Sequence, residues 1–257
     1  MVVGEASGGA VRLAGSRPLL SLVLPAYNEA RRIAASLAAC AEYFDDRGMA
    51  AEIIVADDGS TDHTGEAFAD AIDDLPQAGI TYRYLPLAHR GKGSAVRAGV
   101  QSATGDPIVF LDSDLTIPVE IIDRFLRVID DGADIAIASR YVPGSVVRRP
   151  WWRRFMGSGF RACVHALVPT DVQDTQCGGK AYTAEAAKDL FHRQRLHGFA
   201  FNAEVLFLAR RARYRVREIP FALVQDHETS INFAAQAPRM MRDLIRIRVN
   251  DVLGRYR

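Results

Sequence analysis

The sequence predicts an α/β fold built on a mostly parallel, doubly wound sheet. Through the first half of the 257-residue chain, short continuous apolar runs alternate with longer amphipathic stretches. This alternation is typical of buried parallel strands that are joined by helices. Polar or glycine-containing segments follow directly after the apolar runs, which is where open sheets of this kind bind ligands. We therefore expect a ligand site at the carboxyl ends of the strands.

The expected elements follow one another regularly up to residue 139. Each strand is a short apolar run, and each helix carries apolar residues at helical spacing. The strands are expected at Leu19–Leu24, Glu52–Ala56, Ile80–Leu85, Pro107–Leu111 and Ile135–Ser139, with helices between them at Glu29–Phe44, Thr64–Ile72, Lys92–Ala103 and Pro118–Asp130.

The second half of the chain has a less regular pattern. Helices are expected near Trp151–Ala166, Ala184–Phe191, Asn202–Arg211 and Pro238–Val252, and strands near Lys180–Thr183 and Tyr214–Ile219. No internal repeat, low-complexity segment or clear linker interrupts the sequence. We therefore predict a single domain over residues 18–257, preceded by a disordered tail at residues 1–17.

Composition and charge exclude several classes of protein. A formal net charge of +1 and the lack of a nucleic-acid-binding motif argue against a nucleic-acid partner. Three cysteines without a CxxC pair argue against a disulfide framework and favour a reducing, cytoplasmic location. The longest apolar stretch, Pro18–Ala26, is far shorter than the about 20 residues that span a bilayer. The tail lacks the apolar core of a signal peptide, so neither a leader nor a transmembrane segment is expected.

The turn after the first strand carries no dinucleotide or P-loop signature. It reads PAYNEARRI, with Pro25, Tyr27, Asn28 and Glu29 at the expected start of a helix. A nicotinamide or flavin enzyme would carry GxGxxG here, and a P-loop NTPase would carry GxxxxGK[ST]; neither motif is present. The turn is therefore either a polar ligand contact or an ordinary helix start capped by Asn28.

The second and third strands are followed by an acidic turn and a glycine-flanked lysine. Asp57 and Asp58 stand at the end of the second strand, where a carboxylate can accept from the N–H edge of a nucleobase. Asp-Gly turns are also common without a ligand, but we expect Asp58 to have little packing role. Lys92 lies between Gly91 and Gly93 at a helix N-terminus, which suits a diphosphate or, alternatively, serves only as a glycine-rich cap.

The fourth strand is followed by the acidic motif of the chain, Asp112-Ser113-Asp114. Alternation in an extended segment places both carboxylates on one face. One or two carboxylates completed by substrate phosphates are the expected ligands of Mg²⁺, and Mn²⁺ uses similar oxygen ligands. A carboxylate that can bind a nucleobase, a loop that can bind a diphosphate and a metal site thus follow the second, third and fourth strands in turn. This order predicts an enzyme that uses a nucleotide sugar.

A basic stretch lies between Ile135 and Thr170, where the chain has no Asp or Glu. Arginines of such a stretch suit phosphate groups, although a solvated basic face is the alternative. We assign an acceptor phosphate to the first three of its arginines, Arg140, Arg148 and Arg149.

These motifs resemble those of the family 2 glycosyltransferases with the GT-A fold, and most closely the polyprenyl- and dolichyl-phosphate glycosyltransferases. The stretches that carry the resemblance are SLVLPAYNEARRI, EIIVADDGSTDHT, RGKGSAVRAG, GDPIVFLDSDLTIP, DTQCGGKAYT and FAFNAEVLFLARR. The resemblance implies a Rossmann-like GT-A domain and an inverting transfer from a nucleoside-diphosphate sugar. Asn202 stands where this family usually carries Asp.

The resemblance also implies roles for single residues. The nucleotide would contact Pro25, Tyr27, Glu29 and Asp58, with Asp57 close by, and Asp112 and Asp114 match the DxD metal site for Mg²⁺ or Mn²⁺. Asp112 and Lys92 are expected to contact the nucleotide sugar as well. Asp174, Gln176 and Glu204 fall in the sugar and acceptor region, where we expect Gln176 to contact the sugar and Asp174 and Glu204 to be the candidate catalytic groups.

Two acceptors remain open from the sequence. A UDP- or GDP-sugar would donate either to a polyprenyl or dolichyl phosphate, or to a hydroxyl of a small soluble acceptor. A phosphate monoester is largely ionised near neutral pH and needs no base, whereas a hydroxyl would need one. Two segments, Arg148–Leu167 and Arg239–Arg257, mix apolar and basic residues as helices at a membrane surface do, so we also expect peripheral membrane contact.

Overall fold

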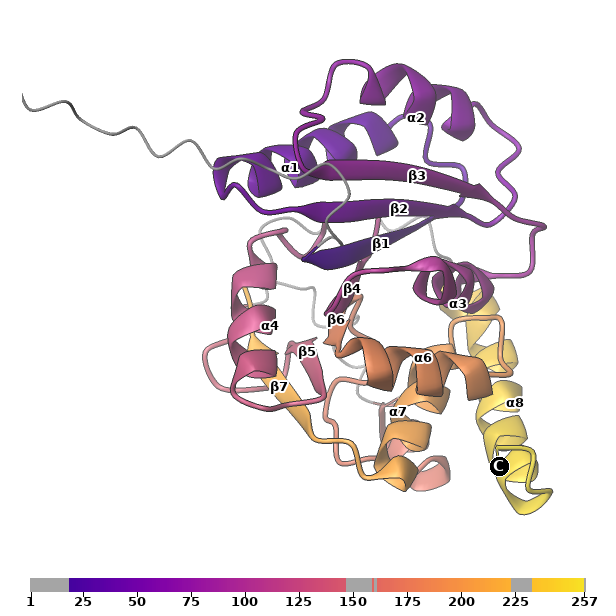
Figure 1. The fold of residues 1–257 in the computed structure, drawn as a ribbon. Coiled ribbons are helices and arrows are strands. Elements are labelled where there is room, and N and C mark those ends of the chain that lie inside the picture. Colours follow the sequence, from indigo (N-terminus) through magenta and orange to yellow (C-terminus); the bar gives the residue numbers. More distant parts are fainter. Residues whose placement is uncertain (1–18, 147–158, 160, 223–232, 257) are drawn as a thin grey trace, which may run out of the picture.

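The computed structural model describes residues 19–146, 159, 161–222 and 233–256 as a single α/β domain (Figure 1). The predicted tail at residues 1–17, the predicted phosphate ligands Arg148 and Arg149, and the adjacent Trp151 and Trp152 lie outside the described residues. None of the helices in the described ranges is both long and apolar enough to cross a bilayer.

The described elements confirm the predicted α/β class. The strands are β1 (Leu20–Ala26), β2 (Ala51–Asp57), β3 (Ile80–Pro86), β4 (Ile108–Leu111), β5 (Ile135–Ser139), β6 (Gly179–Tyr182) and β7 (Val216–Pro220). The helices are α1 (Ile33–Asp46), α2 (Thr64–Ile72), α3 (Lys92–Ser102), α4 (Ile121–Asp130), α6 (Ala184–Arg193), α7 (Phe201–Ala212) and α8 (Phe233–Val252). Residues 161–167 are helical as well.

The sheet brings the predicted motifs to one edge. Its strand order is β3-β2-β1-β4-β6-β5-β7, and β1 pairs in parallel with both β2 and β4. The carboxyl ends of β1 to β4 therefore meet at the same edge. β2 and β3 lie on one side of β1, and β4, which follows β3 in the chain, lies on the other side, so the strand order reverses at β1. Such a switch point is where open α/β sheets bind ligands.

One strand of the second half runs against its neighbours. β6 is antiparallel to both β4 and β5, and Leu111 at the end of β4 pairs with Gly179 at the start of β6. This register places Cys177 and Gly178 directly beside Asp112, whose N–H donates to the Gly178 carbonyl at 3.1 Å. The antiparallel strand thus carries a segment from late in the sequence to the same edge as the early motifs.

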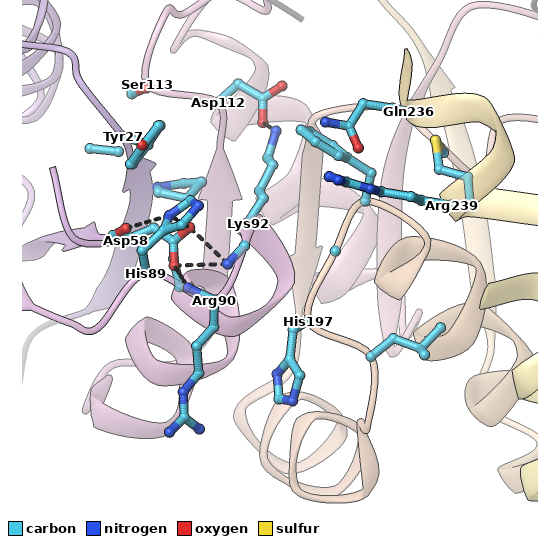
Figure 2. Close-up of a pocket in the computed structure, with 18 of the residues that line it drawn as sticks. Tyr27, Asp58, His89, Arg90, Lys92, Asp112, Ser113, His197, Gln236 and Arg239 are labelled. Atoms are coloured by element: carbon cyan, nitrogen blue, oxygen red, sulfur yellow. Dashed lines mark hydrogen bonds and ion pairs between the residues drawn. The ribbon is translucent and has the colours of Figure 1, made fainter. Parts of the chain in front are cut away.

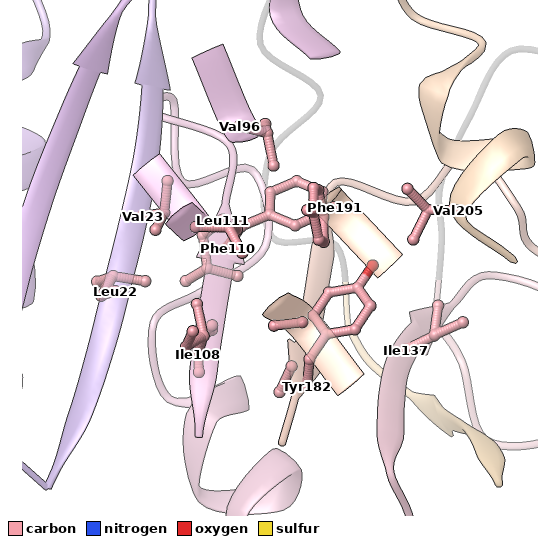
Figure 3. Close-up of a cluster of buried hydrophobic side chains, with 14 of the residues drawn as sticks. Leu22, Val23, Val96, Ile108, Phe110, Leu111, Ile137, Tyr182, Phe191 and Val205 are labelled. Carbon is pink, nitrogen blue, oxygen red and sulfur yellow. The ribbon is translucent and has the colours of Figure 1, made fainter. Parts of the chain in front are cut away.

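The core lies between the sheet and its helices. Figure 3 shows Phe110 of β4, Tyr182 of β6 and Phe191 of α6 within one cluster, and the rings of Tyr182 and Phe191 meet edge to face at 5.5 Å. In Figure 1, α4 covers one side of the β4–β7 half of the sheet, and α6 and α7 cover the other. Fully burying side chains of this size stabilises the fold by about 1.5–3 kcal/mol each.

Two predicted helix starts lie four or more residues from the starts of the described helices. α1 begins at Ile33 instead of Glu29, because Asn28 adopts a left-handed conformation (φ 56°) and residues 29–32 form a turn before the helix. α8 begins at Phe233, so Pro238 lies inside the helix and does not start it. The sequence pattern favoured Pro238 as a first residue because proline lacks the N–H that an interior position donates.

Candidate active site

A cleft of about 1050 Å³ opens at the carboxyl ends of β1 to β4 (Figure 2). The sheet side is built by the loops after these four strands, and the opposite side by the loop before α7 and by α8. The lining residues are Pro25–Glu29, Arg32, Asp58, His89–Lys92, Ala95, Asp112–Asp114, Leu196–Phe199, Gln236, Arg239, Met240, Arg242, Asp243 and Arg246.

An aromatic pair lies at one end of the cleft. The ring of Tyr27 stacks on His89 with centroids 4.5 Å apart and an interplanar angle of 27°. Asn28 fixes this turn, since its side-chain oxygen accepts from the N–H of Thr61 at 2.8 Å. Burial raises the pKa of the neighbouring Glu29, and the nearby Asp114 adds to the rise. The turn therefore lines the cleft, and Asn28 caps no helix here.

Asp58 is buried and holds the loop between β3 and α3. Its carboxylate accepts from the N–H of Arg90 at 2.9 Å and from the N–H of Gly91 at 2.8 Å, and Nδ1 of His89 lies 2.9 Å from Oδ2. The expectation that Asp58 has little packing role is thus wrong. Its strand end adjoins a loop whose partly buried backbone donors need an acceptor.

Replacing Asp58 by alanine is expected to weaken nucleotide binding and also to lower the free energy of unfolding by about 1–3 kcal/mol, because two backbone donors lose their acceptor. Urea unfolding and calorimetric titration with nucleoside diphosphates measure the two effects. Asp70→Ala, at an exposed position of α2, is the control and should leave both unchanged. A fully stable Asp58→Ala variant would contradict the structural role.

Asp57 faces away from the cleft lining. Its carboxylate accepts from the N–H and hydroxyl of Ser60, at 3.1 and 2.5 Å, and from the hydroxyl of Tyr84. These bonds close the turn after β2. A direct role of Asp57 in binding the nucleotide sugar stays a prediction.

Lys92 and the acidic motif meet in the centre of the cleft. Nζ of Lys92 donates to Oδ1 of Asp112 at 2.5 Å, and Oδ1 of Asp114 accepts from the N–H of Thr116 at 3.0 Å. Gly178 leaves room for Asp112, since a Cβ atom at Gly178 would collide with the Asp112 carboxylate. Among the described residues, no group of three or more His, Cys, Asp or Glu side chains is arranged to hold a metal ion.

The candidate base Asp174 is locked in an ion pair. It is buried, and Arg140 donates to it through Nε and Nη2, both at 2.6 Å, and through its backbone N–H at 3.0 Å. Burial by itself would raise the pKa of Asp174, but the hydrogen bonds from Arg140 hold it below the usual range. Neither residue lines the cleft. The base role of Asp174 and the acceptor-phosphate role of Arg140 therefore stay predictions, and the geometry supports neither.

The second candidate base, Glu204, joins two segments of the chain. Its carboxylate accepts from the N–H groups of Arg195 and Leu196 at 3.1 and 2.8 Å and from the Tyr256 hydroxyl at 2.5 Å. Burial raises its pKa, yet it is absent from the cleft lining, as is Gln176. A catalytic role of Glu204 and a sugar contact of Gln176 stay predictions.

The cleft thus contains most of the residues predicted to bind the nucleotide and the metal, and it lacks the predicted catalytic residues. Brought together are Pro25, Tyr27, Glu29, Asp58, Lys92, Asp112 and Asp114. Sequence reasoning missed the loop Leu196–Phe199 and the cleft-facing residues of α8. The α8 arginines were visible in the sequence, but their pattern was interpreted as a membrane helix, and only the tertiary packing turns part of that helix toward the cleft.

Comparison with known proteins agrees with this geometry. Glucosyl-3-phosphoglycerate synthase of Mycobacterium tuberculosis, crystallised with Mn²⁺, UDP and its product, superposes with a TM-score of 0.63 at 22% identity, covering 93% of this chain and 80% of that one. Dolichyl-phosphate beta-glucosyltransferase of Saccharomyces cerevisiae is 30% identical over 93% of this chain and 76% of its own length. The Mus musculus protein of the same name is also 30% identical, over 93% and 77%.

The fold is the GT-A fold that this mycobacterial neighbour shares. Residues 21–191 match the family described as glycosyl transferase family 2, and this chain belongs to that family. The resemblance predicted from the motifs is confirmed.

Proposed function

We propose that this enzyme transfers a hexose, with glucose favoured, from a UDP- or GDP-sugar to the phosphate of a polyprenyl or dolichyl lipid, with inversion at the anomeric carbon. The observation that carries the proposal is one cleft in which the Tyr27–His89 stack, Asp58, Lys92 and the Asp112–Asp114 pair lie together. The names of the relatives, dolichyl-phosphate beta-glucosyltransferases, support the acceptor and the sugar. UDP in the neighbouring structure supports a uridine donor.

A divalent cation fits the acidic motif. Asp112 and Asp114 both line the cleft, and they offer the carboxylate oxygens that Mg²⁺ and Mn²⁺ prefer. Two carboxylates suit a cation whose coordination substrate phosphates complete. When bound, such a cation neutralises charge on the leaving diphosphate. Mn²⁺ in the neighbouring structure supports this cofactor.

Other residues of the cleft can bind the nucleobase and the diphosphate of the donor. The Tyr27–His89 stack offers a face for a nucleobase, and Lys92 brings a positive charge to the diphosphate at the N-terminus of α3. The acceptor oxygen attacks the anomeric carbon from the opposite face as the diphosphate leaves. A phosphate monoester, with a second pKa of about 6, is already ionised. The engagement of Asp174 and Glu204 outside the cleft supports an acceptor that needs no base.

Membrane contact is assigned to one face of α8. Met240 and Leu244 of the predicted membrane segment are buried in the core, so they are unavailable to lipid. Ile245, Val249 and Val252 are 53%, 47% and 82% exposed and recur at helical spacing. We call these three residues the α8 stripe. Exposed apolar residues beside arginines suit a helix that lies in the membrane interface.

Replacing Ile245 and Val249 together by serine is expected to reduce co-sedimentation with anionic liposomes several-fold at low salt, because apolar area that enters the interface is lost. KM for the nucleotide sugar should not change. Leu19→Ser, at an apolar position that is 53% exposed and outside α8, is the control. Equal sedimentation of the stripe variant and wild type would contradict this role for α8.

The proposed function is tested by incubating the protein with candidate nucleotide sugars and a prenyl phosphate. The expected result is formation of the glycosyl phospholipid with release of the nucleoside diphosphate. The prenyl alcohol and small hydroxylated acceptors are the comparison substrates. Transfer to a hydroxyl acceptor without transfer to the prenyl phosphate would favour a soluble glycosyltransferase instead.

A further inference from the structure

A row of arginines faces the cleft from α8. Arg239, Arg242 and Arg246 are spaced by three and four residues, so they share one side of the helix. All three line the cleft, and all three are exposed. Figure 2 shows Arg239 reaching from α8 toward Lys92 and Asp112 on the sheet side. This wall therefore presents positive charge opposite the acidic motif.

Two members of this row have no acidic partner within the described ranges. Lys92 in the cleft pairs with Asp112 at 2.5 Å, and Arg246 of the row pairs with Asp243 at 3.4 Å, whereas the cleft-lining Arg90 forms no ion pair with a described carboxylate. No ion pair with a described carboxylate involves Arg239 or Arg242. Burial and the nearby Arg90, Arg97 and Arg246 lower the pKa of His197 in the adjoining loop, as expected where positive charge is in excess. Such an excess suits an anionic ligand.

We propose that Arg239 and Arg242 form the subsite for the phosphate of the lipid acceptor, an inference that rests on the proposed function. Lys92 and the N-terminus of α3 already provide for the diphosphate on the sheet side. The α8 row lies on the other wall, from which a second phosphate can approach the sugar. Arg140, the described residue that the sequence assigned to this phosphate, is held by Asp174.

The position of the row beside the α8 stripe supports a lipid as the source of the phosphate. At about 100° per residue, Arg242 and Arg246 neighbour Ile245 and Val249 around the helix. A phosphate held by the row thus leaves its prenyl chain next to exposed apolar side chains. A donor diphosphate carries a sugar and a nucleoside and gains nothing from this apolar surface.

The experiment compares Arg239→Gln and Arg242→Gln with wild type on a short-chain, water-soluble prenyl phosphate, which removes membrane binding from the measurement. KM for the acceptor is expected to rise about tenfold or more in each variant, because a charge-assisted hydrogen bond is lost. KM for the nucleotide sugar should stay unchanged. The matched control is Arg248→Gln, since Arg248 is an exposed arginine of the same helix, paired with Asp251 at 3.6 Å and outside the cleft.

Two outcomes overturn the subsite. A rise in KM for the nucleotide sugar alone would show that the arginines bind the donor diphosphate. Unchanged KM values for both substrates would show that the arginines bind neither phosphate. Calorimetric binding of the prenyl phosphate separates this inference from the proposed function. Suppose that the wild type binds the prenyl phosphate without transferring sugar to it, and that Arg239→Gln loses this binding. The proposed function is then wrong, but the phosphate subsite is supported. If the wild type does not bind the prenyl phosphate, both fail.

Discussion

Asp114→Ala is expected to lower kcat/KM for sugar transfer by roughly 10³-fold or more while the protein stays folded. Metal-ion catalysis is worth several kcal/mol of transition-state stabilisation, and each 1.36 kcal/mol corresponds to about a tenfold change in rate. Asp114 is partly exposed, and its described hydrogen bond is to the N–H of Thr116. The free energy of unfolding should therefore fall by only about 1 kcal/mol.

Steady-state kinetics with added Mg²⁺ or Mn²⁺, beside urea unfolding, measures this prediction. Asp114→Asn keeps the size of the side chain and removes its charge, so it should lose activity as well. Asp131→Ala, at an exposed acidic position after α4, is the control. Full turnover of the wild-type enzyme in excess chelator would rule out the metal.

Asp174→Ala is expected to lower the free energy of unfolding by about 3–5 kcal/mol, because it leaves the guanidinium of Arg140 without its carboxylate. The side chains of Asp174 and Arg140 are 1% and 17% exposed. Since the pKa of Asp174 is lowered in the folded state, the pair stabilises the protein above the ordinary Asp pKa. The difference between variant and wild type should narrow only as the pH falls below that value.

Urea unfolding at neutral and acidic pH measures the effect of Asp174. The control is Asp171→Ala. The side chain of Asp171 is 82% exposed and lies 3.3 Å from Arg210, so its removal should change the free energy of unfolding by no more than about 1 kcal/mol. A stable Asp174→Ala variant that loses only turnover would instead support Asp174 as the catalytic base.

The first half of the fold followed from local patterns in the sequence. The strands β1, β2 and β4 are largely apolar runs that are buried along their whole length, as continuous runs predict, whereas β3 is the edge strand and is mostly only partly buried. Parallel strands place their following loops at one edge, which is why Asp58, Lys92 and Asp112 could be grouped before their distances were known. The antiparallel direction of β6 carries no such local signal, since it depends on which neighbours the strand pairs with.

The second half of the site depended on tertiary contacts. Asp174 and Glu204 lie within the family motifs, but donors to their carboxylates come from residues 34 and 52 positions away, Arg140 and Tyr256. Pattern alone does not distinguish a carboxylate that faces a ligand from one that satisfies a buried arginine or backbone. The sequence also does not show which face of α8 is buried. Leu244 is buried and the adjacent Ile245 is exposed because of how α8 packs on the domain.

Glu204 makes the far wall of the cleft a single rigid unit. One carboxylate at the start of α7 anchors both the loop that contains Leu196 and, through Tyr256, the segment after α8. The near wall, with Asp112, belongs to the sheet. α7 packs on α6, and α6 packs on β6 at contacts such as Phe191 on Tyr182. A change in that packing is therefore expected to alter the distance between the two walls.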